Sequence, residues 1–502
     1  MDQVLQQQYA DIMSANALHT RNRNRWSFLL DSYVGGDEYR RGQYLTKYVL
    51  ESPSEYSQRL DTTPLENHCK SIVATYISFL FREEPDRDMG SLSTELALED
   101  FMEDCDWEGR DLDSFMKQAA IWANVFGHSW ILMSKPDIGA VTRADELAEG
   151  VRPYLNLLTP LSVTDWRWTR RLNGSYELSY LKYVEDANDS QTTIKEWFLD
   201  RVTTTVVDHK NQTVLQRQEE ANGLGKIPAV IVYAQASPVR GIGLSTISDL
   251  ADVQRFIYNM TSEAEQAVRL GLHPSLVKTE STQAGSGAGS IIHMPEHLDP
   301  NLKPYVLEFT GSDISNIYTA INHAADAIDK MANTGSIRAT EAREMSGVSR
   351  EVEFQLLNAR LSEMADNIEL AEEQLWQFYA LYQGYTWDGE IEYPDSFSVR
   401  DTGNDIKQYI DSLAAVQDPA KKQTLEWAIM TALDIEGPEH EQAEESGEEE
   451  HPSLEGMSTQ DRLMHLQDML MEGYSNDEII ALHPEVTVEE IVQAGAEAAR
   501  SN

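Results

Sequence analysis

Two amphipathic helical patterns that flank a short β-prone segment constrain the fold of this chain most strongly. Apolar residues recur every three or four positions over residues 245–271, and the same spacing returns over residues 313–333. Residues 273–312, between them, read as short strands and turns. Ser245 and Gly271 are the expected caps of the first helix. The residues of the two apolar stripes that we expect to pack the helices are Leu250, Ile257, Met260, Ile317, Ile321 and Ile328. Because an apolar stripe must be buried against another element, the pattern predicts a helix–β–helix unit packed against partners.

The rest of the chain is helical on either side of a β-rich stretch. Residues 1–135 read as mostly helical, and turn signals such as Asn173-Gly174 separate strand-like runs further on. The predicted strands are 154–158, 176–184, 193–199, 203–207 and 229–233. The longest regular pattern, residues 352–383, predicts one helix of about 45 Å, whose apolar face serves either core packing or a subunit interface. The predicted fold class is therefore α+β, predominantly helical, with antiparallel β insertions.

Charge narrows the possible functions. The 502 residues hold 40 Lys and Arg against 84 Asp and Glu, a net charge of -44. A protein that grips nucleic acid over a broad basic face is excluded, because neutralising phosphates requires Lys and Arg. The length suggests about three domains, and 41% apolar residues allow a sizeable core.

The last hundred residues are the most acidic part of the chain. Residues 403–502 hold 5 Lys or Arg and 23 Asp or Glu, a net charge of -18. A low-complexity acidic linker, residues 437–452, precedes short predicted helices at 461–471, 476–482 and 488–499. Such a linker is too polar to join a packed core, and we expect it to be mobile.

No motif points to catalysis, a metal or a cofactor. Gly285, Gly287 and Gly289 follow a G-x-G-x-G spacing, which is not the dinucleotide fingerprint and indicates a turn. The run Gly223-Leu-Gly225-Lys226 lacks the first glycine and the Ser or Thr of a phosphate-binding loop. His128 lies among apolar residues and reads as a core or turn histidine. We expect no catalytic residue, no cofactor and no metal, and therefore not an enzyme.

The sequence carries no signal for export or for a membrane. Cys69 and Cys105 lack the spacing of a disulfide framework or zinc site, which fits a reducing compartment. The N-terminus has no signal-peptide pattern, and the longest apolar stretch, residues 71–81, is shorter than the roughly 20 residues that span a bilayer. We expect a soluble intracellular protein with no membrane partner.

Several segments, taken in order, resemble the portal proteins of tailed bacteriophages. They are YLTKYVLESPSEYSQRL (44–60), DLDSFMKQAAIWANVFGHSWILMSKP (111–136), RPYLNLLTPLSVTDWRW (152–168), the lead into the first long helix (226–277) and SGVSREVEFQLLNARLSEMADNIELAEEQLWQFY (346–379). The resemblance covers about residues 40–390. The order of the segments is more specific than any one of them, and the last hundred residues are not covered.

The resemblance implies a portal-type fold and a ring, usually of about twelve subunits, at one capsid vertex. The implied regions are a wing (1–240 and 352–402), a first stem helix (241–272), a clip (273–312), a second stem helix (313–335), a tunnel loop (336–351) and a crown (403–502). Antiparallel β insertions would lie in the wing and the clip. Neighbours around the ring would cover the amphipathic stem helices.

The same resemblance implies contact residues. The clip, which would meet the terminase and later the tail adaptor, contains Lys278, Glu280, Gly285, Gly287, Met294 and Lys303. The tunnel loop, which would face DNA, contains Ser336, Arg338, Arg343, Ser346 and Arg350. We expect the three arginines to touch the DNA backbone transiently, because strong phosphate binding would stall translocation. An ordinary solvated loop is the other interpretation of this segment.

The implied function is a non-enzymatic channel for DNA packaging and genome ejection, made in the host cytoplasm and located in the virion. Its partners would be further copies of the chain, double-stranded DNA passing non-specifically, the terminase, the tail adaptor and the major capsid protein. The alternative is another non-enzymatic virion, adaptor or scaffold protein with helical stems. Because acidic subunits repel one another, we also expect salt to strengthen assembly.

Overall fold

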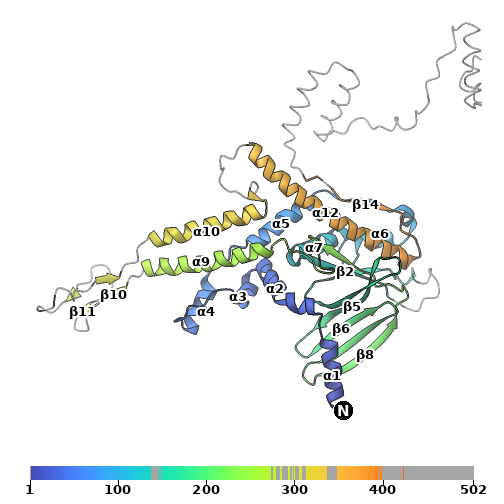
Figure 1. Cartoon of the computed structure of the whole chain (residues 1–502), viewed down its shortest axis with the longest axis horizontal. Coiled ribbons are helices and arrows are strands. Elements are labelled where there is room, and N and C mark those ends of the chain that lie inside the picture. The colour runs from blue at the N-terminus through green and yellow to red at the C-terminus, as the bar shows by residue number, and fades with distance from the viewer. Residues whose placement is uncertain are drawn as a thin grey trace, which may run out of the picture. The chain divides into compact units, whose positions relative to one another are not determined.

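The structure is a computed structural model. It describes residues 2–136, 146, 148–272, 275–278, 283–284, 292–293, 297, 299, 305–307, 312–335, 347–394, 396–397 and 422. The chain divides into two compact units, Met1–Ser398 and Val399–Asn502, where its length alone suggests about three. The helices and strands described below belong to the first unit (Figure 1). The predicted acidic linker and the short helices that follow it lie outside the described residues.

The N-terminal part is mostly helical, as its sequence pattern predicts. Its elements are α1 (Asp2–Met13), α2 (Ala17–Val34), α3 (Gly36–Arg41), α4 (Pro53–Thr62), α5 (His68–Leu80), β1 (Asp86–Asp88), the 3-10 helix η1 (Gly90–Thr94), α6 (Leu98–Glu103) and α7 (Leu112–Phe126). Four helices begin after a polar side chain that accepts a hydrogen bond from a first-turn N–H: Asn16, Ser52, Asn67 and Asp111. Each cap satisfies a backbone donor that the helix itself leaves unpaired, so local sequence sets these starting points.

A three-stranded antiparallel sheet lies beside α7. Its strands are β2 (His128–Ser134), β3 (Tyr154–Leu158) and β9 (Ala229–Tyr233), in the order β3–β2–β9. The central strand, β2, is buried along nearly its whole length, and α7 packs against it. A strand buried on both faces is apolar, and residues 130–133 at its centre are a continuous hydrophobic run.

A second sheet is a five-stranded antiparallel meander. Its strands, in sheet order, are β4 (Val163–Arg170), β5 (Tyr176–Ala187), β6 (Gln191–Phe198), β7 (Arg201–Asp208) and β8 (Thr213–Ala221). The antiparallel β region is therefore confirmed, but β4 and β8 were not among the predicted strands. Most side chains of β8 are exposed, so that strand lacks the apolar alternation by which a half-buried strand is found.

The predicted helix–β–helix unit is present as an antiparallel hairpin. Its elements are α9 (Ser248–Leu272), β10 (Ser275–Val277), β11 (Gln283–Ala284), β12 (Ile292–His293), β13 (Tyr305–Leu307) and α10 (Ser312–Met331). β10 pairs with β13 and β11 with β12, so α9 and α10 run side by side and extend away from the two sheets (Figure 1). Both expected caps of the first helix are wrong, because α9 begins at Ser248, three residues after Ser245, and continues through Gly271 to Leu272.

The longest of the described helices, α12 (Gly347–Gln383), contains 37 residues and is about 55 Å long. It begins five residues before the predicted pattern and is followed by β14 (Glu390–Glu392), which pairs with β1. Its heptad face, represented by Leu357, Leu361 and Ile368, is buried within the same chain and joins the main core. Of the two interpretations of this face, core packing is therefore confirmed.

Candidate functional site

The α9–α10 hairpin is the candidate site, because its long helices carry the apolar stripes singled out in the sequence. Four of the six stripe residues are buried and two, Met260 and Ile317, are partly buried; the buried ones are Leu250, Ile257, Ile321 and Ile328. They pack into the core of a single chain. The stripes therefore find their partners without a neighbouring subunit, and amphipathicity alone does not require a ring.

Gly127, between α7 and β2, and Gly243, before α9, bring the start of the hairpin into contact with the rest of the first unit. A Cβ built on Gly243 would lie 1.9 Å from the carbonyl oxygen of Gly127, so the two backbones are in direct contact. The Gly243 N–H donates to Nδ1 of His128 at 3.3 Å, and the Ser245 hydroxyl donates to the Val125 carbonyl at 2.7 Å. These contacts join the end of α7 and the start of β2 to the segment that leads into α9.

His128 is the buried polar group at this junction, and its location in the core confirms the sequence interpretation. Its ring is surrounded by Trp26, Trp130 and Tyr233. Burial lowers the pKa of His128 to about 3, because a charged imidazole would have no water around it. The side chain is therefore neutral at physiological pH and serves packing at the hairpin base.

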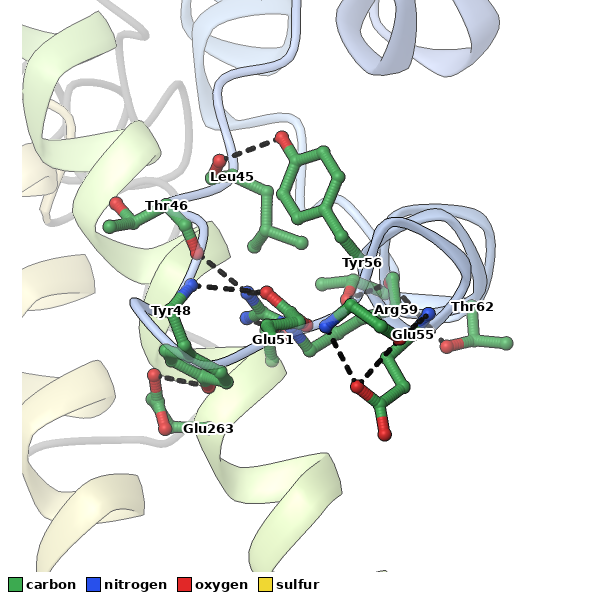
Figure 2. Close-up of polar contacts among 12 residues, drawn as sticks. Leu45, Thr46, Tyr48, Glu51, Glu55, Tyr56, Arg59, Thr62 and Glu263 are labelled. Atoms are coloured by element: carbon green, nitrogen blue, oxygen red, sulfur yellow. Dashed lines mark hydrogen bonds and ion pairs between the residues drawn. The ribbon is translucent and has the colours of Figure 1, made fainter.

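A buried ion pair attaches α4 to the middle of the hairpin (Figure 2). Arg59 donates to both carboxylate oxygens of Glu51 at 2.8 and 3.0 Å and to the Thr46 carbonyl at 2.6 Å. Its remaining nitrogen donates to the hydroxyl of Ser262 on α9 at 3.0 Å. Only 3% of the Arg59 side chain and 5% of the Glu51 side chain are exposed. The hydrogen bonds from Arg59 lower the pKa of Glu51, so this pair is charged at neutral pH.

Tyr48 covers this pair and adds a second attachment to α9. The Arg59 guanidinium lies 3.9 Å from the centre of the Tyr48 ring, within cation–π range. The Tyr48 hydroxyl donates to Glu263 of α9 at 2.6 Å, and burial raises the pKa of Tyr48 to about 12. We call residues 44–62, held in this way, the α4 clamp.

The α4 clamp was not predicted as a site, although the sequence 44–60 carries part of the family resemblance. Arg59 and Ser262 are separated by 203 residues, so no local spacing brings them together. The one sequence signal is the start of α4, where Ser52 and Glu55 form a capping box around Pro53.

The residues expected to face DNA lie almost entirely outside the described part of the chain. Ser336, Arg338, Arg343 and Ser346 are outside it, and Arg350 belongs to the first turn of α12 without a described side chain. The end of α10 before this segment is anchored, because the Tyr76 hydroxyl donates to the Ala332 carbonyl at 2.6 Å. Asn333, just beyond α10, has a φ of 55° and ends the helix where the sequence predicts.

The expected clip residues are described only in part. Lys278 directly follows β10 and is exposed. Glu280, Gly285, Gly287, Met294 and Lys303 lie outside the described residues. The β10–β13 pair lies beyond the ends of α9 and α10, and the β11–β12 pair lies further out (Figure 1).

The weak phosphate-loop resemblance has the wrong structural context. Gly223, Gly225 and Lys226 form the turn between β8 and β9, where the Asn222 side chain donates to the Lys226 carbonyl at 2.8 Å. A phosphate loop must lead from a strand into a helix, and here it leads into a strand. Within the described ranges, no group of three His, Cys, Asp or Glu side chains could hold a metal ion. No helix in that part of the chain is long and apolar enough to cross a bilayer.

Comparison with known proteins gives matches among solved structures alone. No protein-family model and no curated protein matches the chain. The neck of an empty gene transfer agent particle, computed with C6 symmetry, aligns with a TM-score of 0.42 and 12% identity, over 78% of this chain and 98% of that chain. The neck of a native particle, computed with C12 symmetry, gives 0.38 and 11% over 79% and 98%. A chain of the native gene transfer agent virion gives 0.39 and 11% over 77% and 97%. The chain is thus similar, over about four fifths of its length, to chains of gene transfer agent particles.

Proposed function

We propose that this chain is a portal protein, the subunit of a ring that forms the DNA channel at one vertex of a phage-like capsid. The observation that carries the proposal is the antiparallel α9–α10 hairpin, with short β pairs at its far end and the two sheets at its base. Two of the sequence segments that resemble portal proteins, 226–277 and 346–379, contain α9 and most of α12. In the proposal, α9 and α10 are the stem, residues 273–312 are the clip, and residues 1–240 and 352–402 are the wing.

The proposed ring is tested first on the purified protein. We expect negative-stain images to show a ring of about twelve copies around a central hole, and native mass spectrometry to give one defined copy number. A ring is expected because a channel lined by one kind of subunit requires cyclic symmetry. A stable monomer or dimer at micromolar concentration would overturn the proposal.

The proposed DNA contact is tested by neutralising the tunnel-loop arginines. We expect Arg338→Gln, Arg343→Gln and Arg350→Gln together to lower DNA packaging and genome retention, because these side chains would contact phosphates transiently. The matched control neutralises Arg170, Arg201 and Arg217 of the five-stranded sheet, and it should package DNA as the wild type does. If both triple variants package and retain DNA normally, the three loop arginines have no such role.

In the same proposal the clip binds the terminase during packaging and the tail adaptor afterwards, while the wing contacts the major capsid protein. The virion is then the site of action, after synthesis in the host cytoplasm. Charge reversal at Lys278, the one proposed clip residue within the described ranges, tests this docking. We expect Lys278→Glu rings to assemble normally but to bind less tail adaptor in a pull-down, whereas unchanged adaptor binding would remove Lys278 from the interface.

A further inference from the structure

Two aliphatic side chains stand fully in solvent at the tip of the α4 clamp. Val49 is 98% exposed and Leu50 is 96% exposed, although the residues on either side of them are held firmly. Tyr48 is bonded to α9, and Glu51 is bonded to Arg59. A buried ion pair therefore presents two apolar side chains that the chain itself does not cover, which is typical of a contact surface.

The tip and α10 lie on opposite sides of α9. The α4 clamp bonds to Asn259, Ser262 and Glu263. The apolar stripe of α9 includes Met260 and Ala264, each two positions from Ser262 and therefore about 200° away around the helix. Figure 1 shows the same arrangement, with α4 on one side of α9 and α10 on the other.

The outer face of α10 lies at the same height along the hairpin as the tip. Ser275 of β10 faces Leu307 of β13; α9 ends three residues before Ser275, and α10 begins five residues after Leu307. Counting about 1.5 Å per residue in each helix places Tyr318 within about one turn of Glu263, which holds Tyr48. Tyr318 is 50% exposed on α10.

The α10 face around Tyr318 is uncharged, so another copy of this acidic chain can approach it. Residues 314–325 contain no Lys, Arg, Asp or Glu, although the whole chain has a net charge of -44. The exposed neighbours of Tyr318 are Ser315, Asn316, Thr319 and Asn322. Two copies of an acidic protein can approach closely at such an uncharged face, because no like charges are brought together.

We propose that the Val49–Leu50 tip of one copy packs against Tyr318 on α10 of the next copy. The contact joins two different surfaces, so it repeats head to tail from copy to copy. Because both surfaces lie at one height, a rotation about an axis along the hairpin brings them together without a shift, and the series closes into a ring. The inference rests on the proposed function, and it identifies a contact that holds neighbouring subunits together.

Cysteine cross-linking tests the contact directly. The two natural cysteines are both buried, so Val49→Cys and Tyr318→Cys introduce the accessible thiols. With a short bismaleimide, we expect the double variant to give a ladder of covalent oligomers that ends at the ring number. Neither single variant should give a ladder, since identical positions in a head-to-tail ring are one full subunit apart. A strong dimer band from Val49→Cys alone would show tip-to-tip pairing and overturn the inference.

A charge at the tip tests whether the contact supports assembly. We expect Leu50→Asp to raise at least tenfold the concentration needed for ring formation, with an unchanged far-UV circular dichroism spectrum. The matched control is Leu172→Asp, a fully exposed leucine at the β4–β5 turn, which should leave assembly unchanged.

The outcomes separate this inference from the proposed function. If the wild type forms a ring, but the double-cysteine variant gives no ladder and Leu50→Asp still forms rings, the tip contact is overturned and the portal proposal stands. If the double-cysteine variant gives a ladder but the wild type forms open filaments, the contact is supported and the ring is overturned. If the wild type is a monomer and the double-cysteine variant gives no ladder, both proposals are overturned. If Val49→Cys cross-links solely to a co-expressed adaptor or capsid protein, the contact between copies is overturned.

Discussion

At the scale of single residues, the charged and titratable groups that should affect stability most are those that are buried in the fold. Arg59 and Glu51 remain charged because each supplies the other's hydrogen bonds, whereas His128 remains neutral because nothing compensates a charge there. Both groups contact the hairpin or its base, His128 at Gly243 before α9 and Arg59 at Ser262 in the middle of α9. Their substitution therefore tests how firmly the hairpin is held.

Removing the charge of Arg59 should be strongly destabilising. Arg59→Gln leaves Glu51 buried without its partner, and we expect a loss of about 3–5 kcal/mol in the free energy of unfolding. The matched control is Arg41→Gln, whose ion pair with Glu38 lies in solvent and should be worth less than about 1 kcal/mol. Urea unfolding at pH 7 measures both, and equal effects of the two variants would contradict the α4 clamp.

His128 should make the folded state sensitive to acid. Its pKa is about 3 in the folded chain and about 6.5 when unfolded, so between these values the unfolded state alone takes up the proton. Stability contributed by the neutral ring is then complete above pH 6.5 and is lost as the pH falls towards 3. The slope is at most about 1.4 kcal/mol per pH unit.

The variant His128→Gln tests this expectation, since glutamine keeps a hydrogen-bond acceptor but does not titrate in this range. We expect it to be less stable than the wild type at pH 7 and to lose less further stability between pH 6.5 and 4. Parallel stability curves for the two proteins in urea unfolding would show that His128 does not titrate in this window.

At the scale of elements, α12 shows how one helix separates core from surface. Leu361 is fully buried on its heptad face, whereas Leu370 is exposed on the same helix. We expect Leu361→Ala to lower the free energy of unfolding by about 2–5 kcal/mol, because it leaves a cavity, and Leu370→Ala to change it by less than about 0.5 kcal/mol. Urea unfolding distinguishes the two. A Leu361→Ala effect that grew on dilution would instead indicate a subunit interface.

At the scale of the whole molecule, the net charge of -44 determines how copies approach one another. The Debye length falls from about 30 Å at 0.01 M salt to about 8 Å at 0.15 M, so the repulsion between neighbouring acidic subunits weakens as salt rises. We expect the assembled fraction, measured by sedimentation velocity, to increase between 0.01 and about 0.5 M sodium chloride. A ring that dissociates over this range would show that ion pairs, rather than apolar contacts, hold the subunits together.

The sequence by itself determined the long helices, most strands and the helix–β–helix order of this protein. The spacing of apolar residues indicates which side of a helix or strand is buried. One or two turns of helix, as around Ile257 and Leu361, are enough to establish that spacing. Helix starts at Ser52 and Asn67 are equally local, because a cap bonds to the next turn of its own helix. The strand β8 was missed for the same reason, since its exposed side chains leave no periodic signal.

The tertiary structure alone decided what covers those faces. It placed the stripe of α9 and the heptad face of α12 inside one chain, where the sequence left neighbouring subunits open as partners. It also joined Arg59 to Ser262 across 203 residues and left Val49 exposed beside that buried contact. The spacing of apolar residues predicts that a side chain is buried, but it does not identify the residues that cover it. Those residues come from distant parts of the chain, and their positions depend on the path of the whole backbone.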